Sequence, residues 1–382
     1  MVTPRSTMPP PDPLAAEHSA RLQATIAAAI RSAGGWIPFD RYMELALYAP
    51  GLGYYAAGTR KFGDSAAGGD FVTAPEISPL FAAALARQAA QVFAHVPARI
   101  VEFGAGSGVL ARDLLEALAA RDVAVESYSI VELSADLADR QRALLQGRKV
   151  EWLSGPPAAF EGVMLANEVL DVMPVRLFVK RGGAACERGV ALQDNGFVFA
   201  EREADAGLRT TVAEIERDVG TLPDGYGSEI GLAASAWMRS AAGWLARGVL
   251  LAIDYGFPRR EYYHPQRLMG TLMCHYRHHA HADPLWLPGL NDITAHVDFT
   301  AMADAAHEAG LEVLGYTSQA HFLMNCGLLD ELSGDHSPRR ANEAQRLLSE
   351  AEMGELFKVL AVGRGLVEPL IGFGRGDRLA RL

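Results

Sequence analysis

The chain has 382 residues, of which 49% are hydrophobic, and it carries a formal net charge of -11 at pH 7. This length exceeds one typical domain, so we expect one main domain with a substantial insertion or satellite. The acidic balance argues against a nucleic-acid surface and favours a basic partner. Cys186, Cys274 and Cys326 are too few and too far apart for a disulfide framework, and no apolar run is long enough to span a membrane.

The N-terminal part predicts helices separated by a long loop. Residues 1–13 are Pro-rich and lack the apolar core of a secretory signal, so we expect a disordered tail. Apolar residues at helical spacing predict a helix from Leu14 to about Ser32, and residues 39–50 predict a second. The glycine-rich stretch 51–81 predicts a long ordered loop, and a helix over 79–93 follows it.

From Arg99 the chain alternates between strands and helices. The expected strands end at Phe103, Glu132 and Asn167, with a further short strand in KVEWL and a helix over 134–145. This alternation predicts a doubly wound α/β sheet.

Two insertions interrupt this pattern. After Pro174 the apolar period changes to two in VRLFVKR, ERGVALQ and GFVFAERE, which predicts antiparallel strands inserted at about 175–227. A helix over 228–246 and a strand over 249–256 return to the sheet, and a second, loop-rich insertion covers about 257–298. A helix over 299–309 and strands in EVLGYT and ELFKVLAVG complete the main domain, which we place at 99–382.

The run RIVEFGAGSG combines a buried strand, an acid and three alternating glycines before a helix. Glycine turns of this kind also occur for structural reasons alone, so the acids decide the interpretation. A dinucleotide fingerprint places its third glycine one residue later and holds a pyrophosphate. Glu102 would repel a phosphate and attract an ammonium group, and Glu132, at the end of the next strand, can accept both ribose hydroxyls. S-adenosylmethionine fits this pattern better than NAD.

Further acids follow neighbouring strands, and the carboxyl ends of parallel strands share one edge of the sheet. Glu168 and Asp171 lie three residues apart after the strand ending at Asn167, so a helical turn would point both carboxylates the same way. Such a pair could hold a guanidinium, although both acids also fit a helix start. We assign catalysis to Glu168 first and Asp171 second, with Asp254 as a support.

Two other segments offer weaker signals. The hydroxyl groups of Thr73 or Ser78, just before a helix, could bind a carboxylate or merely cap the helix. Six histidines between 264 and 296 match no metal-site spacing, so we expect no metal and interpret them as exposed or hydrogen-bonded side chains, with the lining of an acceptor channel as the alternative.

Several long motifs together resemble one family. They are YMELALYAPGLGYY, GGDFVTAPEISPLF, VEFGAGSG, ANEVLDVMPV, IDYG, GTLMCHYRHHAHADPLWLPGLNDITAHVDF and MGELFKVL. The chain resembles the MidA-type S-adenosylmethionine-dependent methyltransferases, which are related to a mitochondrial complex I assembly factor that methylates an arginine of a respiratory subunit.

The resemblance implies a class I (Rossmann-like) methyltransferase fold whose N-terminal extension, residues 14–98, carries a loop that covers the cofactor. It implies that Asn167 and Glu168 face the methyl group. The residues that we expect to bind the cofactor are Glu102, Gly104, Ala105, Gly106, Ser107, Gly108, Glu132, Leu133 and Asn167, with Asp70, Thr73, Pro75 and Glu76 from the covering loop.

The leading hypothesis is therefore methylation of an arginine side chain in a protein partner, for example a respiratory-complex subunit. The alternatives are a small-molecule O- or N-methyltransferase and a non-catalytic assembly factor that binds the cofactor. We expect no nucleic-acid partner and no membrane insertion. The expected compartment is the cytoplasm, or the mitochondrial matrix in a eukaryotic source, and the sequence leaves the oligomeric state open.

Overall fold

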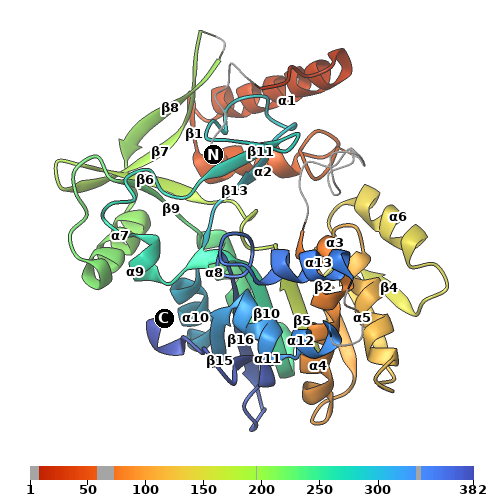
Figure 1. Ribbon diagram of the computed structural model, residues 1–382. Helices are drawn as coiled ribbons and strands as arrows, with labels where there is room; N and C mark the ends of the chain where they lie inside the picture. The colour runs from red at the N-terminus through yellow and green to blue at the C-terminus, as the bar shows by residue number, and fades with distance from the viewer. Residues whose placement is uncertain (1–7, 58–72, 195, 333–336) are drawn as a thin grey trace. The chain divides into compact units, whose positions relative to one another are not determined.

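The computed structural model describes residues 8–57, 73–194, 196–332 and 337–382 (Figure 1). The chain divides into two compact units. The core unit consists of Val72–Leu170, Ala236–Gly256 and Phe299–Leu382. The inserted unit consists of Met1–Phe71, Asp171–Ser235 and Phe257–Asp298. Each unit is described by itself below.

The core unit contains a sheet whose strand order is β15-β16-β10-β5-β2-β3-β4. The bounds of its strands are Arg99–Phe103 for β2, Ser127–Val131 for β3, Val150–Leu153 for β4, Phe160–Asn167 for β5, Leu245–Phe257 for β10, Glu312–Ser318 for β15 and Phe357–Arg364 for β16. Neighbours from β4 to β10 pair in parallel, and β16 pairs antiparallel with both β10 and β15. The order reverses between β2 and β5. The doubly wound sheet predicted from the sequence is therefore confirmed.

Both faces of strand β2 are covered, and three of its four buried residues, Ile100, Val101 and Phe103, are apolar. Ile100 joins a buried cluster that includes Leu85 and Leu114 from two helices. Phe103, whose side chain points to the opposite face, meets the rings of Trp237 and Trp244 at centroid distances of 5.1 and 5.7 Å. Alternate side chains of a strand point to opposite faces, so burial on both sides favours an unbroken apolar run.

The helices of the core unit follow the strands in sequence. Their bounds are Ala74–Ile77 for α3, Pro79–Phe93 for α4, Val109–Ala119 for α5, Ala135–Leu144 for α6, Leu232–Trp244 for α8, Phe299–Glu308 for α10, Gln319–Asn325 for α11, Leu328–Leu332 for α12 and Pro338–Leu348 for α13, with short 3-10 turns at Ile371–Phe373 and Leu379–Arg381. Helix α6 is capped by Ser134, whose hydroxyl oxygen accepts a hydrogen bond from the amide of Leu137 at 3.4 Å. A serine cap of this kind satisfies an amide that the helix itself leaves unpaired.

The inserted unit is built on a smaller antiparallel sheet of order β1-β7-β6-β9, in which β8 also pairs with β7. The element bounds are Pro13–Ser32 for α1, Trp36–Pro38 for β1, Phe39–Tyr48 for α2, Arg176–Arg181 for β6, Ala184–Gln193 for β7, Gly196–Glu203 for β8, Ala206–Val219 for α7, Gly227–Ile230 for β9, Arg259–Tyr262 for α9, Met273–Tyr276 for β11, His279–His281 for β12, Asp292–Thr294 for β13 and Val297–Asp298 for β14. The antiparallel strands predicted after Pro174 are confirmed as β6, β7 and β8.

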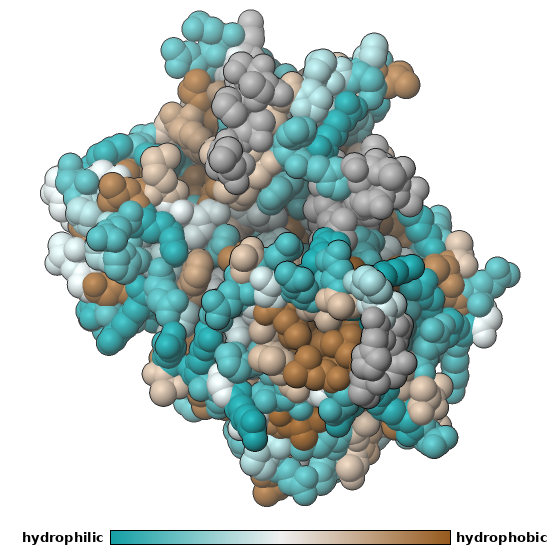
Figure 2. All heavy atoms as spheres, viewed as in Figure 1, coloured by the Kyte–Doolittle hydropathy of each residue, from teal (hydrophilic) through white to brown (hydrophobic). Residues whose placement is uncertain are grey.

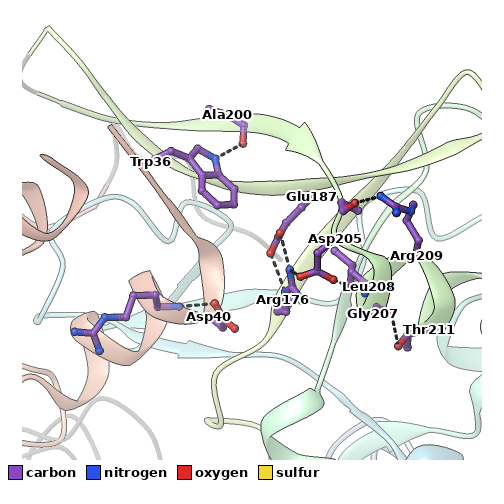
Figure 3. A network of polar contacts seen from close by, with 12 residues as sticks. Trp36, Asp40, Arg176, Glu187, Ala200, Asp205, Gly207, Leu208, Arg209 and Thr211 are labelled. Atoms are coloured by element: carbon purple, nitrogen blue, oxygen red, sulfur yellow. Dashed lines mark hydrogen bonds and ion pairs between the residues drawn. The ribbon is translucent and has the colours of Figure 1, made fainter. Parts of the chain in front are cut away.

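Arg176 at the start of β6 is the centre of an ion-pair network in the inserted unit (Figure 3). Its Nε and Nη2 donate to the two oxygens of Glu187 at 2.8 and 2.6 Å. The same Nη2 donates to Asp205, the residue that caps α7, at 2.8 Å. These hydrogen bonds, the one to Glu187 above all, raise the pKa of Arg176. The network joins β6, β7 and the first turn of α7.

The histidine-rich segment folds as a small sheet of order β12-β11-β13. Arg277 and His278 both have positive φ, 47° and 65°, as the two central residues of a tight hairpin turn require. The ring of His281 is buried; its Nδ1 accepts the amide of Asp283 at 3.3 Å, so its Nε2 carries the proton towards Oδ1 of Asn291 at 3.2 Å. His281 therefore has a structural role in this segment, with both ring nitrogens hydrogen-bonded.

Most elements expected from the sequence are present, and the differences lie outside the alternating core. The segment 257–298 contains strands where a loop was predicted, and the predicted helix over 228–246 starts later because β9 occupies Gly227–Ile230. Among the described residues, six helices were not anticipated, namely α3, α7, α9, α11, α12 and α13. Residues 1–7 of the expected tail lie outside the described residues.

The surface of the described residues is mainly hydrophilic in the face that Figure 2 shows, with brown spheres gathered over the helices drawn in blue in Figure 1. Exposed apolar side chains on those helices include Met324 and Leu329. Among the helices of the described ranges, none has the length and hydropathy to cross a membrane.

Candidate functional site

The segments that follow β2, β3 and β5 meet Asp254 of β10 along one edge of the core-unit sheet. The register pairs Phe103 with Val131 on one side and with Ala166 on the other, so Gly104 lies between Glu132 and Asn167. The next pairing, Ile253 with Asn167, brings Asp254 beside Glu168. This edge includes the point where the strand order reverses, between β2 and β5. In doubly wound sheets, ligands bind in the crevice at that point.

The glycine turn between β2 and α5 uses three left-handed backbone conformations. Gly104, Gly106 and Gly108 have φ angles of 60°, 53° and 83°. The amide of Gly104 donates to the carbonyl of Val131 at 3.0 Å, which ties the start of the turn to β3. A residue with a Cβ is strained at such φ angles, so glycine is required for the backbone path as well as for close approach of a ligand. Ala105 and Ser107 occupy the intervening positions.

Glu102 directly precedes this turn and is almost fully buried, with 3% of its surface exposed. Its Oε2 accepts a hydrogen bond from the hydroxyl of Tyr128 at 2.6 Å. Burial raises the pKa of Glu102 to about 7, although the Tyr128 hydrogen bond works in the opposite direction. Since desolvation penalises the charged form, this carboxyl group gains most from a cationic ligand.

Glu132 lies at the end of β3, held by two neutral donors. The amide of Ser134 donates to its Oε1 at 2.9 Å, and Nε2 of Gln141 donates to its Oε2 at 2.9 Å. Burial raises the pKa of Glu132, and these two hydrogen bonds oppose the shift. Leu133, the next residue, leaves 85% of its surface exposed beside this acid. An apolar side chain there can contact the flat face of a base.

Gln141 on α6 is a residue of this edge that the sequence analysis missed. It is fully buried, and its Nε2 also donates to the carbonyl of Gly106 at 2.9 Å. The available signal was its position on the buried face of α6, with Leu137 and Ala138. A buried amide needs partners, so a glutamine among apolar positions indicates a polar network.

Asn167, the last residue of β5, and Glu168, which follows it, both adopt energetically unfavourable arrangements. The side chain of Asn167 donates from Nδ2 to Oε1 of Glu168 at 3.1 Å, while its buried Oδ1 has no partner among the described residues. Glu168 has a φ of 53°, which is costly for a residue with a Cβ. The amide of Glu168 donates to the carbonyl of Ile253 at 2.9 Å, which holds this backbone. Penalties of this kind gather at functional sites.

Asp254, at the end of β10, is fully buried and binds backbone amides. Its Oδ2 accepts from the amide of Leu170 at 2.9 Å, and its Oδ1 accepts from the amide of Tyr255 at 2.9 Å. The bond to Leu170 ties the end of β10 to the turn that carries Glu168. Asp254 therefore supports this turn.

The predicted helical turn that would align Glu168 with Asp171 is wrong. The residues after β5 form bends and turns without a helix, because the left-handed Glu168 cannot start one. Asp171 is buried and belongs to the inserted unit, where its carbonyl accepts the amide of Ala295 at 2.9 Å. Its pairing with Glu168 stays a prediction.

The expected covering loop is described only in part, since Asp70 lies outside the described residues. Thr73 precedes α3 without a side-chain capping bond, and Pro75 and Glu76 lie within that short helix. The Ser78 hydroxyl accepts the amide of Leu80 at 3.3 Å and donates to Oε2 of Glu343 at 2.8 Å. Thr73 is thus the better candidate for binding a carboxylate, because the Ser78 hydroxyl is engaged twice.

The histidines do not form a metal site in the described parts of the chain. No group of three or more His, Cys, Asp or Glu side chains there could hold a metal ion. Burial lowers the pKa of His275, which disfavours its charged form.

Comparisons with known proteins identify the cofactor. Residues 84–317 match the family model Methyltransf_28, described as "Putative S-adenosyl-L-methionine-dependent methyltransferase". A crystal structure of a Burkholderia thailandensis protein bound to S-adenosyl-homocysteine is 51% identical, with a TM-score of 0.94 over 98% of this chain and 100% of that one.

Curated relatives are more distant. The Homo sapiens protein arginine methyltransferase NDUFAF7, mitochondrial, is 28% identical over 91% of this chain and 84% of its own length. The Caenorhabditis elegans homolog is 25% identical over 94% and 90%. The resemblance noted in the motifs is confirmed, and the chain belongs to this family of S-adenosyl-L-methionine-dependent methyltransferases.

Proposed function

We propose that the protein transfers a methyl group to a guanidinium nitrogen of an arginine in a protein partner. The observation that carries this proposal is the Asn167–Glu168 pair, which presents a buried amide oxygen without a described partner beside a carboxylate on a strained backbone. A guanidinium offers five N–H donors and a positive charge, so it suits two neighbouring acceptors of this kind.

The cofactor fits the same edge of the sheet. Its ammonium group would lie near Glu102 and its ribose hydroxyls near Glu132, with the glycine turn giving the close approach that only residues without a Cβ allow. When bound, S-adenosylmethionine supplies a methyl group on a sulfonium, which is an excellent leaving group. The remaining cofactor contacts that we propose come from Leu133, Asn167 and the Thr73–Glu76 segment, with Asp70 on the same loop.

The residues of the protein then have two tasks. Asn167 and Glu168 orient the acceptor nitrogen, and Glu168 takes the proton that this nitrogen releases as it bonds to the methyl carbon. Asp254 acts through the turn that carries Glu168, so we assign it a positioning role. Asp171 remains a proposed second contact for the guanidinium. The curated relatives, which are named protein arginine methyltransferases, support this substrate class.

The partner and compartment are proposals as well. The family resemblance favours a respiratory-complex subunit as the partner and a role in complex I assembly. We propose action in the cytoplasm, or in the mitochondrial matrix of a eukaryotic source, since the curated relatives are named mitochondrial.

The test uses labelled S-adenosylmethionine with a lysate of the source organism, followed by hydrolysis and detection of methylarginine. Glu168→Gln should lower kcat about a hundredfold or more while S-adenosylhomocysteine still binds. Glu161→Gln, at the opposite end of β5, is the matched control and should keep wild-type activity.

Other outcomes would overturn the proposal. Label found only in small molecules would identify a small-molecule methyltransferase. A Glu168→Ala protein that fully replaces the wild type in a deletion strain would favour a non-catalytic assembly factor.

A further inference from the structure

The amide of Gln141 connects three parts of the cofactor edge. Its Nε2 reaches both the carbonyl of Gly106 and Oε2 of Glu132, each at 2.9 Å, and its Oε1 accepts from Nε1 of Trp152 at 2.9 Å. The glycine turn, the end of β3 and strand β4 are thus joined through a single fully buried side chain.

Trp152 determines which way this amide faces. An indole N–H can only donate, so the atom of Gln141 that it contacts must be the oxygen. Both amide hydrogens are then directed at Gly106 and Glu132. The indole ring is itself packed beneath the guanidinium of Arg142, 5.2 Å from the ring centroid.

Gln141 also sets the spacing of the glycine turn. A Cβ placed on Gly108 would lie 3.3 Å from Cγ of Gln141, so this side chain packs directly against the end of the turn. Helix α6, which carries Gln141, starts three residues after Glu132, and its cap Ser134 also donates its amide to Glu132. Gln141 therefore adds a second link between the glycine turn and Glu132, beside the backbone hydrogen bond from Gly104 to Val131.

The carboxylate of Glu132 can accept further hydrogen bonds. The donors that reach its oxygens, the amide of Ser134 and Nε2 of Gln141 foremost, are neutral, and a carboxylate oxygen has room for more than one hydrogen bond. No described lysine or arginine forms an ion pair with it. A ribose offers two adjacent hydroxyl donors, so the orientation of this carboxylate decides whether both can bind.

We propose that Gln141, oriented by Trp152, is a positioning residue that aims Glu132 at the ribose of the cofactor and sets the selectivity for its hydroxyl groups. The inference rests on the proposed role of Glu132, and it does not depend on the methyl acceptor. Gln141 touches neither the cofactor nor the reacting atoms in this assignment. Its contribution is to hold the carboxylate and the glycine turn at a fixed separation.

The experiment compares Gln141→Met with wild type by calorimetry, using S-adenosylhomocysteine and its 2′-deoxy analogue as ligands. Methionine keeps the volume and the helix propensity but cannot donate or accept as an amide does. We expect the Kd for S-adenosylhomocysteine to rise about tenfold, while the Kd for the deoxy analogue changes much less. In turnover, KM for S-adenosylmethionine should rise and kcat at saturation should stay near wild type.

Gln88→Met is the matched control. Gln88 is also fully buried on a helix and hydrogen-bonded, but its partners are Gln91 and the amide of Gly372. This variant should lose stability without a change in either Kd. Trp152→Phe, which removes the indole N–H and leaves a smaller aromatic ring, should reproduce the Gln141→Met pattern with a smaller change.

The possible results distinguish a failure of the inference about Gln141 from a failure of the proposed ribose role of Glu132. If Gln141→Met weakens both ligands equally, the residue has only a structural role and the inference fails. If Gln141→Met matches wild type while Glu132→Ala loses binding, the inference fails and the ribose role of Glu132 stands. If Glu132→Ala binds S-adenosylhomocysteine normally, the ribose role itself is wrong, and the inference falls with it.

Discussion

Two pairs of acids in this protein have opposite kinds of hydrogen-bond partner. In the inserted unit, Glu187 and Asp205 both receive hydrogen bonds from one guanidinium, that of Arg176. In the core unit, Glu102 and Glu132 form no ion pair with a described residue and receive neutral donors only, from a tyrosine, a glutamine and a backbone amide. The first arrangement cancels charge within the fold. The second holds carboxylates in place and leaves their charge for a ligand.

The largest expected effect concerns the glycine turn. Gly106→Val should abolish measurable S-adenosylhomocysteine binding, because a β-branched residue cannot adopt a φ of 53° without strain and its side chain occupies the turn. Calorimetry is the measurement. Gly35→Val is the control, since Gly35 also has a positive φ, 93°, but lies in the inserted unit with open space around it. Normal binding by Gly106→Val would show that the turn does not approach the cofactor.

The second prediction concerns the ion-pair network of Arg176, Glu187 and Asp205. Arg176→Met leaves Glu187 buried without its cation, so the free energy of unfolding should fall by about 3 kcal/mol in urea titrations. Affinity for S-adenosylhomocysteine should stay unchanged. Adding Glu187→Met should recover part of the lost stability. A change in cofactor affinity with Arg176→Met would contradict the separation of the two pairs.

The third effect is the pH dependence of stability that Glu102 contributes. Its pKa is raised to about 7, so between the ordinary value of 4.5 and about 7 the folded chain keeps a proton that the unfolded chain has released. Its contribution to stability is therefore full at low pH and declines by about 3 kcal/mol as pH rises through this window. Glu102→Gln should remove that decline.

Cofactor binding should respond to the same proton in the opposite direction. If the ammonium group binds near Glu102, it favours the ionised carboxyl group, so affinity for S-adenosylhomocysteine should rise as pH rises to about 7. Isothermal titration of wild type and Glu102→Gln at several pH values is the measurement. An identical pH profile in both proteins would place the ammonium group elsewhere.

The smallest effect sharpens the role of the neutral donors. Tyr128→Phe removes the hydrogen bond that lowers the pKa of Glu102, so the pKa of this carboxyl group should rise further. We expect the pH profile of cofactor affinity to move to higher pH. One hydrogen bond typically contributes about 1 kcal/mol, which corresponds to a shift of a little under one pH unit. Ser129→Ala on the same strand, whose hydroxyl contacts Glu151, should leave the profile unchanged.

The sequence predicted the parts of the protein whose signal is local. Strands β2, β3 and β5 each contain adjacent apolar residues between turn residues, and the three glycines mark the turn directly. The sheet and one side of its ligand edge could therefore be predicted. The acids at the strand ends could be named for the same reason, since parallel strands end at one edge.

The features that the sequence did not predict depend on contacts between distant residues. Gln141 looks like an ordinary helix residue until Gly106 and Trp152 are placed around it. The left-handed turn at Glu168 was mistaken for a helical turn because acids are common at helix starts, and nothing in the local sequence indicates a positive φ at a glutamate. Helix α7 was missed between strands, although Asp205 before it is a good cap.

The left-handed backbone at Glu168 implies a trade-off between stability and activity. Glycine is the residue that this φ favours, so Glu168→Gly should relieve strain and make the fold more resistant to unfolding, provided that the added flexibility of the unfolded chain does not outweigh the gain. The same change would remove the carboxylate beside Asn167. Stability alone would not favour a glutamate at this position. The presence of Glu168 therefore indicates that its carboxylate serves the proposed activity.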